Sequence, residues 1–249
     1  MTEGHDMVEF TAKIAGHAIG FQVLCPETRM LFSEYLTEEP PQITITSGEG
    51  VLQAERLLMK QTDKENSLSV DGFPDRLLES NFLYREVEEQ LAVHGIVLIH
   101  GSAVAVDGEG YLFIAPSGTG KSTHTRLWRE AFGSRVVMIN DDKPLLECTE
   151  DGILAYGSPW NGKHRLGENI AVPLKAICFL RRGSENQIEK ISDTQAFLPM
   201  LKAVYHAKAA EREACILRSL QYIRKKTAFY QLQCNMEPDA AIVSFEAMK

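Results

Sequence analysis

The residues of this sequence best suited to chemistry lie in one segment, YLFIAPSGTGKSTHTRLWREAF, at positions 111–132. Its first four residues are an apolar run that predicts a buried strand. Residues 115–120 then favour a turn, because they suit neither a strand nor a helix. From Lys121 the spacing becomes helical, and Gly133 is placed to end the helix. A strand, a glycine loop and a helix in this order are typical of a phosphate-binding P-loop.

The pattern within this segment is A-x-x-x-x-G-K-S, with alanine where a P-loop usually has its first glycine. We expect Gly118 and Gly120 to let backbone N–H groups point at an anion, and the start of the helix adds unpaired N–H groups. Lys121 is predicted to reach the β- and γ-phosphates, and the Ser122 hydroxyl to bind magnesium. The other predicted nucleotide-binding residues are Ser117, Thr119 and Thr123. The alternative is an incidental glycine turn.

Two adjacent acidic residues, Asp141 and Asp142, follow a buried strand predicted at 135–139. Adjacent carboxylates at a strand end are costly unless they are solvated or bound to a cation. Beside a P-loop they indicate a magnesium site and a general base. Successive residues of an extended chain face opposite ways, so we expect the two carboxylates to have different roles. A solvent-exposed turn before Pro144 is the alternative.

A second candidate for binding is the glycine-rich loop at 157–168. It contains three successive cationic or titratable residues, Lys163, His164 and Arg165. This loop could hold a substrate or a phosphate, or it could be a solvated surface loop, and the residue types favour neither interpretation.

The composition limits the partners of the protein. The 249 residues are 44% apolar and 24% charged, as in an ordinary globular protein. The net charge of −8 disfavours binding to nucleic acid or to an anionic membrane. The five cysteines include no C-x-x-C pair, which indicates reduced thiols, and the histidines show no spacing typical of a zinc site. With no signal segment or spanning run recognised, we expect a cytoplasmic protein.

The first seventy residues predict a small, mostly β module with no chemical motif. Strands are expected at 8–14, 18–24 and 42–46, while 51–60 fits either a helix or a strand. A helix with an apolar face is predicted from Asp75 to about Val93. We therefore expect two domains, residues 1–70 and residues 71–249.

The second domain is expected to build a mixed sheet around the P-loop. Strands at 96–99, 103–106 and 111–114 are joined by short turns and should be antiparallel, because parallel neighbours need a longer crossover. The later segments predict a hairpin at 145–148 and 153–156, strands at 175–180 and 229–234, a helix at 209–226, and helices capped by Asp193 and Asp239. The fold class is α/β with α+β character, in which partly antiparallel sheets surround the P-loop.

The sequence resembles the HPr kinase/phosphorylase family, whose catalytic fold is shared with the phosphoenolpyruvate carboxykinases. The matching block lies between about residues 95 and 182, roughly a third of the chain. It consists of IHGSAVAV at 99–106, the P-loop at 115–122 and Asn140-Asp141-Asp142. The segment at 169–177 is similar to a subgroup of small HPr-kinase-like proteins, some of which phosphorylate peptides in natural-product pathways.

The resemblance implies roles for single residues. It places Lys121 on the phosphates, Asp142 with Ser122 on magnesium, and Asp141 as the base that removes the proton of the acceptor hydroxyl. It also places His100 near the phosphates, although a histidine at a strand end can be structural. The acidic-Arg-Gly run of the HPr phosphorylases is not recognisable here, since the corresponding region reads NGKHRLG at 161–167. HPr as the acceptor and the reverse reaction are therefore in doubt.

We expect a kinase that uses ATP, or another nucleoside triphosphate, with Mg²⁺ to phosphorylate a Ser/Thr hydroxyl of a small protein or peptide. One alternative is a small-molecule kinase or a phosphoenolpyruvate-linked enzyme on the same scaffold, which needs 157–168 and Arg181-Arg182 to form a closed anionic pocket. Another is a non-catalytic nucleotide-binding regulatory module. The acceptor and any homo-oligomer stay undetermined by the sequence.

Overall fold

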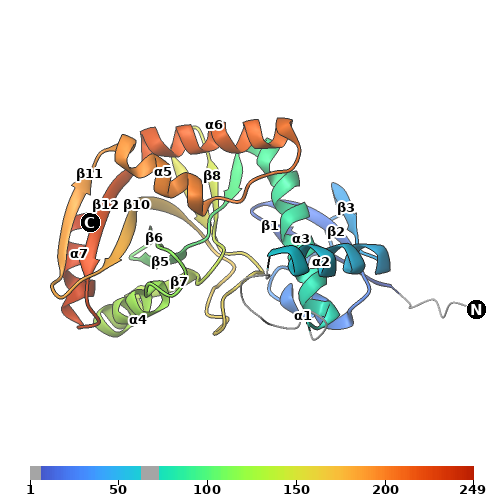
Figure 1. The fold of residues 1–249 in the computed structure, drawn as a ribbon, viewed down its shortest axis with the longest axis horizontal. Helices are drawn as coiled ribbons and strands as arrows, with labels where there is room; N and C mark the ends of the chain where they lie inside the picture. The colour runs from blue at the N-terminus through green and yellow to red at the C-terminus, as the bar shows by residue number, and fades with distance from the viewer. Residues whose placement is uncertain (1–6, 63–72) are drawn as a thin grey trace, which may run out of the picture. The chain divides into compact units, whose positions relative to one another are not determined.

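A computed structural model describes residues 7–62 and 73–249, and the chain forms two compact units, Met1–Gln90 and Leu91–Lys249 (Figure 1). The sequence placed a boundary after residue 70 instead. The difference arises from helix α3 (Asp75–Leu91), which packs in the N-terminal unit. The buried carboxylate of Glu79 on this helix accepts hydrogen bonds from the Leu24 N–H at 2.7 Å and the Thr28 hydroxyl at 2.6 Å.

The N-terminal unit is a three-stranded sheet with helices. Its elements besides α3 are β1 (Val8–Ile14), β2 (His17–Val23), α1 (Pro26–Leu31), β3 (Ile43–Thr46) and α2 (Glu49–Thr62). β1 and β2 are antiparallel, and β3 pairs with β2 in parallel. The segment at 51–60, which fitted a helix or a strand, lies within helix α2. In the core of the N-terminal unit, Phe10, Phe21 and Phe32 pack together, with ring centroids 4.7–5.1 Å apart.

The C-terminal unit contains most of the strands. They are β4 (Ile96–Leu98), β5 (Ser102–Val106), β6 (Glu109–Ile114), β7 (Val136–Asn140), β8 (Leu145–Cys148), β9 (Ile153–Tyr156), β10 (Ala171–Arg182), β11 (Gln187–Ile191) and β12 (Ala228–Cys234). Its α-helices are α4 (Lys121–Phe132), α5 (Asp193–Ala203), α6 (Ala210–Lys226) and α7 (Asp239–Met248). Among the described residues, no helix combines the length and apolar character needed to cross a bilayer.

The strands of this unit form the mixed sheet that the sequence predicted. β5 is antiparallel to both β6 and β7, whereas β10 is parallel to β6 and β12. The expected pairing of 96–99 with 103–106 is wrong, because β4 pairs with β8 instead. The backbone between these strands turns away, since the His100 N–H donates to the Ala203 carbonyl at 2.7 Å and the Gly101 N–H to the Asp142 carbonyl at 3.0 Å.

Helices cover both faces of the strands around β6. On one face Leu112, Ile114 and Phe179 pack with residues of α5 and α6. On the other, Tyr111 and Phe113 pack with residues of α4 and α7. Figure 1 shows α5 and α6 on one side of β10 and β6, and α4 and α7 on the other. The loop between β6 and α4 is therefore held at an edge where two packed faces meet.

The helix that follows the predicted P-loop is anchored by a buried histidine. His124 Nε2 lies 3.2 Å from Ser244 Oγ and accepts a hydrogen bond from Trp128 Nε1 at 3.1 Å. Burial lowers the pKa of His124 to about 3. In the folded protein this ring is neutral at all but strongly acidic pH, whereas in the unfolded chain it takes up a proton below pH of about 6.5.

We expect His124 to make the protein less stable as the pH falls. Because the unfolded state binds the proton and the folded state does not, lowering the pH from 7 to 5 should cost about 2 kcal/mol through this residue alone. Urea unfolding at both pH values would measure this change in the wild type and in His124→Gln. The variant should lose less stability over this range. Equal losses in the two proteins would show that His124 is not the responsible group.

Candidate functional site

The glycine loop, residues 115–120, joins the end of β6 to the start of α4. Gly118 and Gly120 have φ of 74° and 124°, a backbone conformation that favours glycine. No atom lies within 4 Å of a Cβ built on either residue, so the space beside the loop is open. α4 begins at Lys121 without a side-chain cap, which leaves its first N–H groups available to an anion.

An arginine at the end of β10 holds this loop. The Arg182 guanidinium donates to the Gly118 carbonyl, and its Nε donates to the Thr119 carbonyl at 3.4 Å. The sequence analysis grouped Arg182 with a substrate pocket and did not connect it to the glycine loop. That connection depends on the parallel pairing of β10 with β6, and no local motif indicates it.

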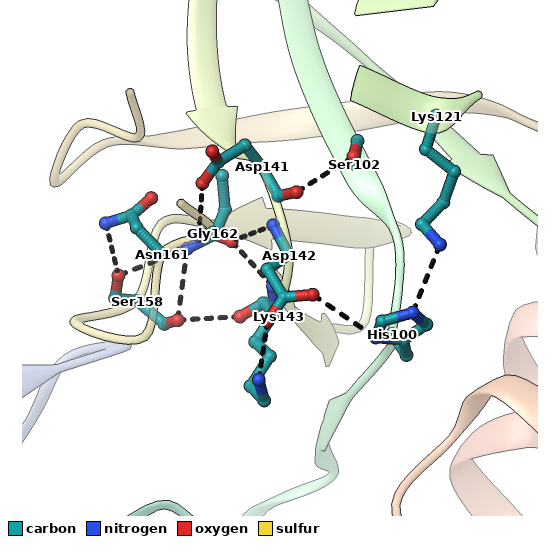
Figure 2. A network of polar contacts seen from close by, with 10 residues as sticks. His100, Ser102, Lys121, Asp141, Asp142, Lys143, Ser158, Asn161 and Gly162 are labelled. Atoms are coloured by element: carbon teal, nitrogen blue, oxygen red, sulfur yellow. Dashed lines mark hydrogen bonds and ion pairs between the residues drawn. The ribbon is translucent and has the colours of Figure 1, made fainter. Parts of the chain in front are cut away.

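Lys121, His100 and Asp142 form a continuous polar chain (Figure 2). Lys121 Nζ lies 3.1 Å from His100 Nε2 and donates to the Ala115 carbonyl at 2.9 Å. On the other side of the ring, His100 Nδ1 lies 3.3 Å from Asp142 Oδ1. Because an ammonium group can only donate, Nε2 accepts and Nδ1 carries the proton toward Asp142.

Burial and neighbouring groups set the charges of Asp142 and Lys121. Burial alone would raise the pKa of the Asp142 carboxyl, but hydrogen bonds from His100 and Lys143 and the positive charge of Lys143 hold it at about 2. Burial lowers the pKa of Lys121, and the negative charge of Asp142 opposes this shift. At neutral pH, Asp142 is therefore a carboxylate that favours the ammonium form of Lys121.

The buried amide of Asn140, which ends β7, orients Asp142. Its Oδ1 accepts hydrogen bonds from the N–H groups of Asp142 at 2.8 Å and Lys143 at 2.6 Å. Its Nδ2 donates to the carbonyl and hydroxyl oxygens of Ser158, both at 3.1 Å. These bonds end the extended chain after Asn140 and tie it to the loop at 157–168. The sequence analysis placed Asn140 in the matching block but gave it no role.

Replacing Asn140 with alanine should destabilise the protein by about 2–4 kcal/mol, since several buried polar groups would lose their partner at once. Urea unfolding would measure this loss. Ser158→Ala is the matched control, because it removes one hydroxyl of the same network and should cost about 1 kcal/mol. A loss for Asn140→Ala no larger than that of the control would contradict the organising role.

Asp141 and Asp142 have different partners, but the chain is bent at both residues, so the alternation of an extended strand is not the cause. Asp141 is 7% exposed, and its Oδ1 accepts a hydrogen bond from the Gly162 N–H at 2.5 Å. Its backbone carbonyl accepts one from the Ser102 hydroxyl at 3.0 Å. Figure 2 shows the Asp141 carboxylate directed at Gly162, while Asp142 and Lys121 point toward His100. Asp141 thus fixes the loop at 157–168.

Other predicted site residues lie on the surface. Ser117 and Ser122 are exposed, and Thr119 and Thr123 are partly exposed. Lys163, His164 and Arg165 are all exposed, and none of them lines the cavity beside His100. The structure therefore brings Lys121, His100 and Asp142 together and leaves these three loop residues apart from them.

Two residues of the candidate site offer the oxygen ligands that Mg²⁺ takes together with phosphates. In the parts of the chain that the structure describes, no group of three or more His, Cys, Asp or Glu side chains is placed to hold a metal. Mg²⁺ needs fewer protein ligands, since it keeps several waters and binds one or two carboxylates together with phosphate oxygens. The ionised Asp142 carboxylate is such a ligand, and the exposed Ser122 hydroxyl offers a further oxygen atom.

Comparisons with known proteins give a family and a distant structural likeness. The family model of the SynChlorMet cassette protein ScmC matches residues 75–240. Among solved structures, the Hpr(Ser) kinase/phosphatase from Coxiella burnetii has a TM-score of 0.36 and 8% identity, over 60% of this chain and 95% of that one. At this score the likeness supports no argument about activity. No curated protein matches the chain.

Proposed function

Since the chain belongs to the family of the SynChlorMet cassette protein ScmC, a name that states no reaction, we propose its function from the geometry of the site. We propose that the protein is a Mg²⁺- and ATP-dependent kinase that phosphorylates a Ser/Thr hydroxyl of a small protein or peptide. Phosphoryl transfer needs mainly positioning and charge stabilisation from a protein, and the groups around the glycine loop are suited to supply both.

The observation that carries this proposal is the chain from Lys121 through His100 to Asp142. It connects the start of α4 to the end of β7, with 3.1 Å between Lys121 Nζ and His100 Nε2 and 3.3 Å between His100 Nδ1 and Asp142 Oδ1. An incidental glycine turn would not need a buried lysine or a histidine held by an ionised carboxylate. A phosphate-transfer site needs both a cation and a proton acceptor.

Each of the three residues Lys121, His100 and Asp142 has a proposed task. Lys121 would leave the Ala115 carbonyl and His100 for the phosphates of ATP, and the N–H groups at the start of α4 would bind the same anion. His100 Nε2, released by this movement, would accept the proton of the acceptor hydroxyl. Asp142 would hold the ring and stabilise its charge. Bound Mg²⁺, held by Ser122 and Asp142, would neutralise charge on the phosphates.

This assignment differs from the role that the family resemblance gave to Asp141. Asp141 is directed at Gly162, so we propose that it positions the loop at 157–168 and that His100 with Asp142 takes the proton. Asp141 contributes indirectly in this scheme, because the loop that it holds is bonded through Ser158 to Asn140 beside Asp142.

The proposal is tested by incubating the full chain with γ-labelled Mg·ATP and a mixture of Ser- and Thr-containing peptides, with products separated by mass. Labelled peptide that disappears when Mg²⁺ is chelated would support the kinase. Nucleotide bound with no labelled product would favour a regulatory module instead. A chain that binds no nucleotide would contradict the proposal at its first step.

A further inference from the structure

A cavity of about 950 Å³ lies beside the proposed transfer site and has no role in the scheme above. Its lining includes His100 and the first residues of the glycine loop, Ala115 to Ser117. The remaining lining comes from β6, β10, β11, β12 and α5. The cavity is at the upper end of the volumes typical of ligand pockets, so it has room for more than one amino-acid side chain. We call it the acceptor cavity.

The acceptor cavity lies on one face of the sheet. Ile114 and Phe179, which line it, belong to the core cluster that packs with α5. The helix that follows the glycine loop packs on the opposite face, where Trp128 contacts Tyr111 and Phe113. Phosphates bound at the start of α4 would therefore be reached from the acceptor cavity past His100.

This position suits the second reactant. In phosphoryl transfer the attacking oxygen and the leaving oxygen lie roughly in line on opposite sides of the phosphorus. His100, the proposed proton acceptor, is 46% exposed and lines the cavity. A hydroxyl within reach of His100 therefore has the rest of its molecule in this cavity.

The lining is apolar at its base and charged at its rim. Phe179 and Leu180 are buried, while Leu198 on α5 is 57% exposed and presents an apolar surface. Arg181 and Lys202 are exposed at the rim, and within residues 7–62 and 73–249 neither forms an ion pair. The one carboxylate of the lining, that of Glu189, accepts a hydrogen bond from Gln231 at 3.2 Å.

We propose that the acceptor cavity binds the peptide segment around the phosphorylated Ser or Thr, with an apolar side chain on Phe179 and Leu198 and an acidic group at Lys202 and Arg181. This inference rests on the proposed function and names its substrate class. In the reaction the hydroxyl oxygen bonds to the γ-phosphorus, the bond to the bridging oxygen breaks, ADP leaves and the hydroxyl proton passes to His100.

The test is a positional library of Ser- and Thr-containing peptides with γ-labelled Mg·ATP, with each flanking position varied in turn. The wild type should select an apolar residue at one position and Asp or Glu at another. Lys202→Glu should change the preferred charge at the second position from acidic to basic, by about tenfold in relative labelling, because the variant repels the original group. Leu198→Asp should weaken the apolar preference alone.

Lys225→Glu makes the same change of charge on an exposed residue of α6 that does not line the cavity, and it should keep the wild-type preferences. All variants should bind a fluorescent ATP analogue as the wild type does.

Labelled peptides with unchanged charge preference in Lys202→Glu would contradict peptide binding in the acceptor cavity and would leave the proposed kinase activity supported. Loss of nucleotide binding in Lys202→Glu or Leu198→Asp would overturn it too, because the cavity would then hold the base of ATP. Bound nucleotide with no labelled peptide would overturn the peptide class, whereas no bound nucleotide in the wild type would overturn the kinase itself.

Discussion

Replacing Lys121 with alanine is expected to remove at least about 3 kcal/mol of transition-state stabilisation, or a factor of about a hundred or more in the rate of transfer. The Lys121 side chain is buried, and its ammonium group is held between the Ala115 carbonyl and His100 at the start of α4. In the proposed reaction this ammonium leaves both partners for the phosphates, where its positive charge stabilises the transition state. The rate of labelled phosphate transfer from Mg·ATP would measure the effect.

Two matched variants separate this effect from loss of charge or of folding. Lys175→Ala removes the same charge from an exposed ion pair with Glu109, away from the glycine loop, and should transfer phosphate at the wild-type rate. Lys121→Arg keeps the charge but replaces a compact ammonium by a planar fork, so we expect most of the activity to be lost. A Lys121→Ala protein that unfolds at the wild-type temperature and transfers phosphate at full rate would contradict the proposed role of Lys121.

Local elements were predictable because a few residues determine each of them. The hairpin of β8 and β9 has the predicted bounds, since short apolar runs flank Asp151-Gly152. The glycine loop and α4 also follow the prediction, because Gly120 and Gly133 mark the two ends of the helix. In such segments the turn residues and the apolar period specify the same structure.

Strand pairing was less predictable, because it depends on residues far apart in the sequence. β11 was missed: Gln187–Ile191 is a mostly exposed strand with little apolar patterning, and it exists because β12 offers it a partner. β4 has no hairpin with β5, since the backbone near His100 is bonded to Ala203 and Asp142. No pattern of neighbouring residues in the sequence predicts such hydrogen bonds.

In the candidate site, too, local features were predictable and long-range ones were not. The residue types and the glycine loop could be found from the spacing in the sequence. The direction in which each carboxylate points could not be found in this way. Asp142 faces His100 because Asn140 accepts hydrogen bonds from the backbone of residues 142 and 143. Asp141 faces Gly162, where a Cβ would lie 2.9 Å from Asp141 Oδ2 and would displace that carboxylate. Both facts depend on a loop that folds back from residues 157–168.

The consequence is an unequal effect of two conservative changes. Asp142→Asn should lower the turnover number by about 10²–10³, because an amide cannot stabilise the positive charge that His100 would carry after it accepts a proton. Asp141→Asn keeps an oxygen that can accept the Gly162 N–H, so we expect a loss of about tenfold or less, divided between turnover and substrate affinity. Steady-state kinetics on one peptide acceptor would compare them.

A double-mutant cycle with His100→Gln shows whether His100 and Asp142 act as one unit. If they do, the double variant His100→Gln/Asp142→Asn should be hardly slower than the worse single variant, because groups that act together are strongly non-additive. Asp141→Asn combined with His100→Gln should instead multiply the two separate losses. The reverse pattern, with Asp141 coupled to His100 and Asp142 independent of it, would transfer the role of proton acceptor to Asp141. The contacts at 3.1 and 3.3 Å on the two ring nitrogens of His100 would then serve only to hold Lys121 near the glycine loop.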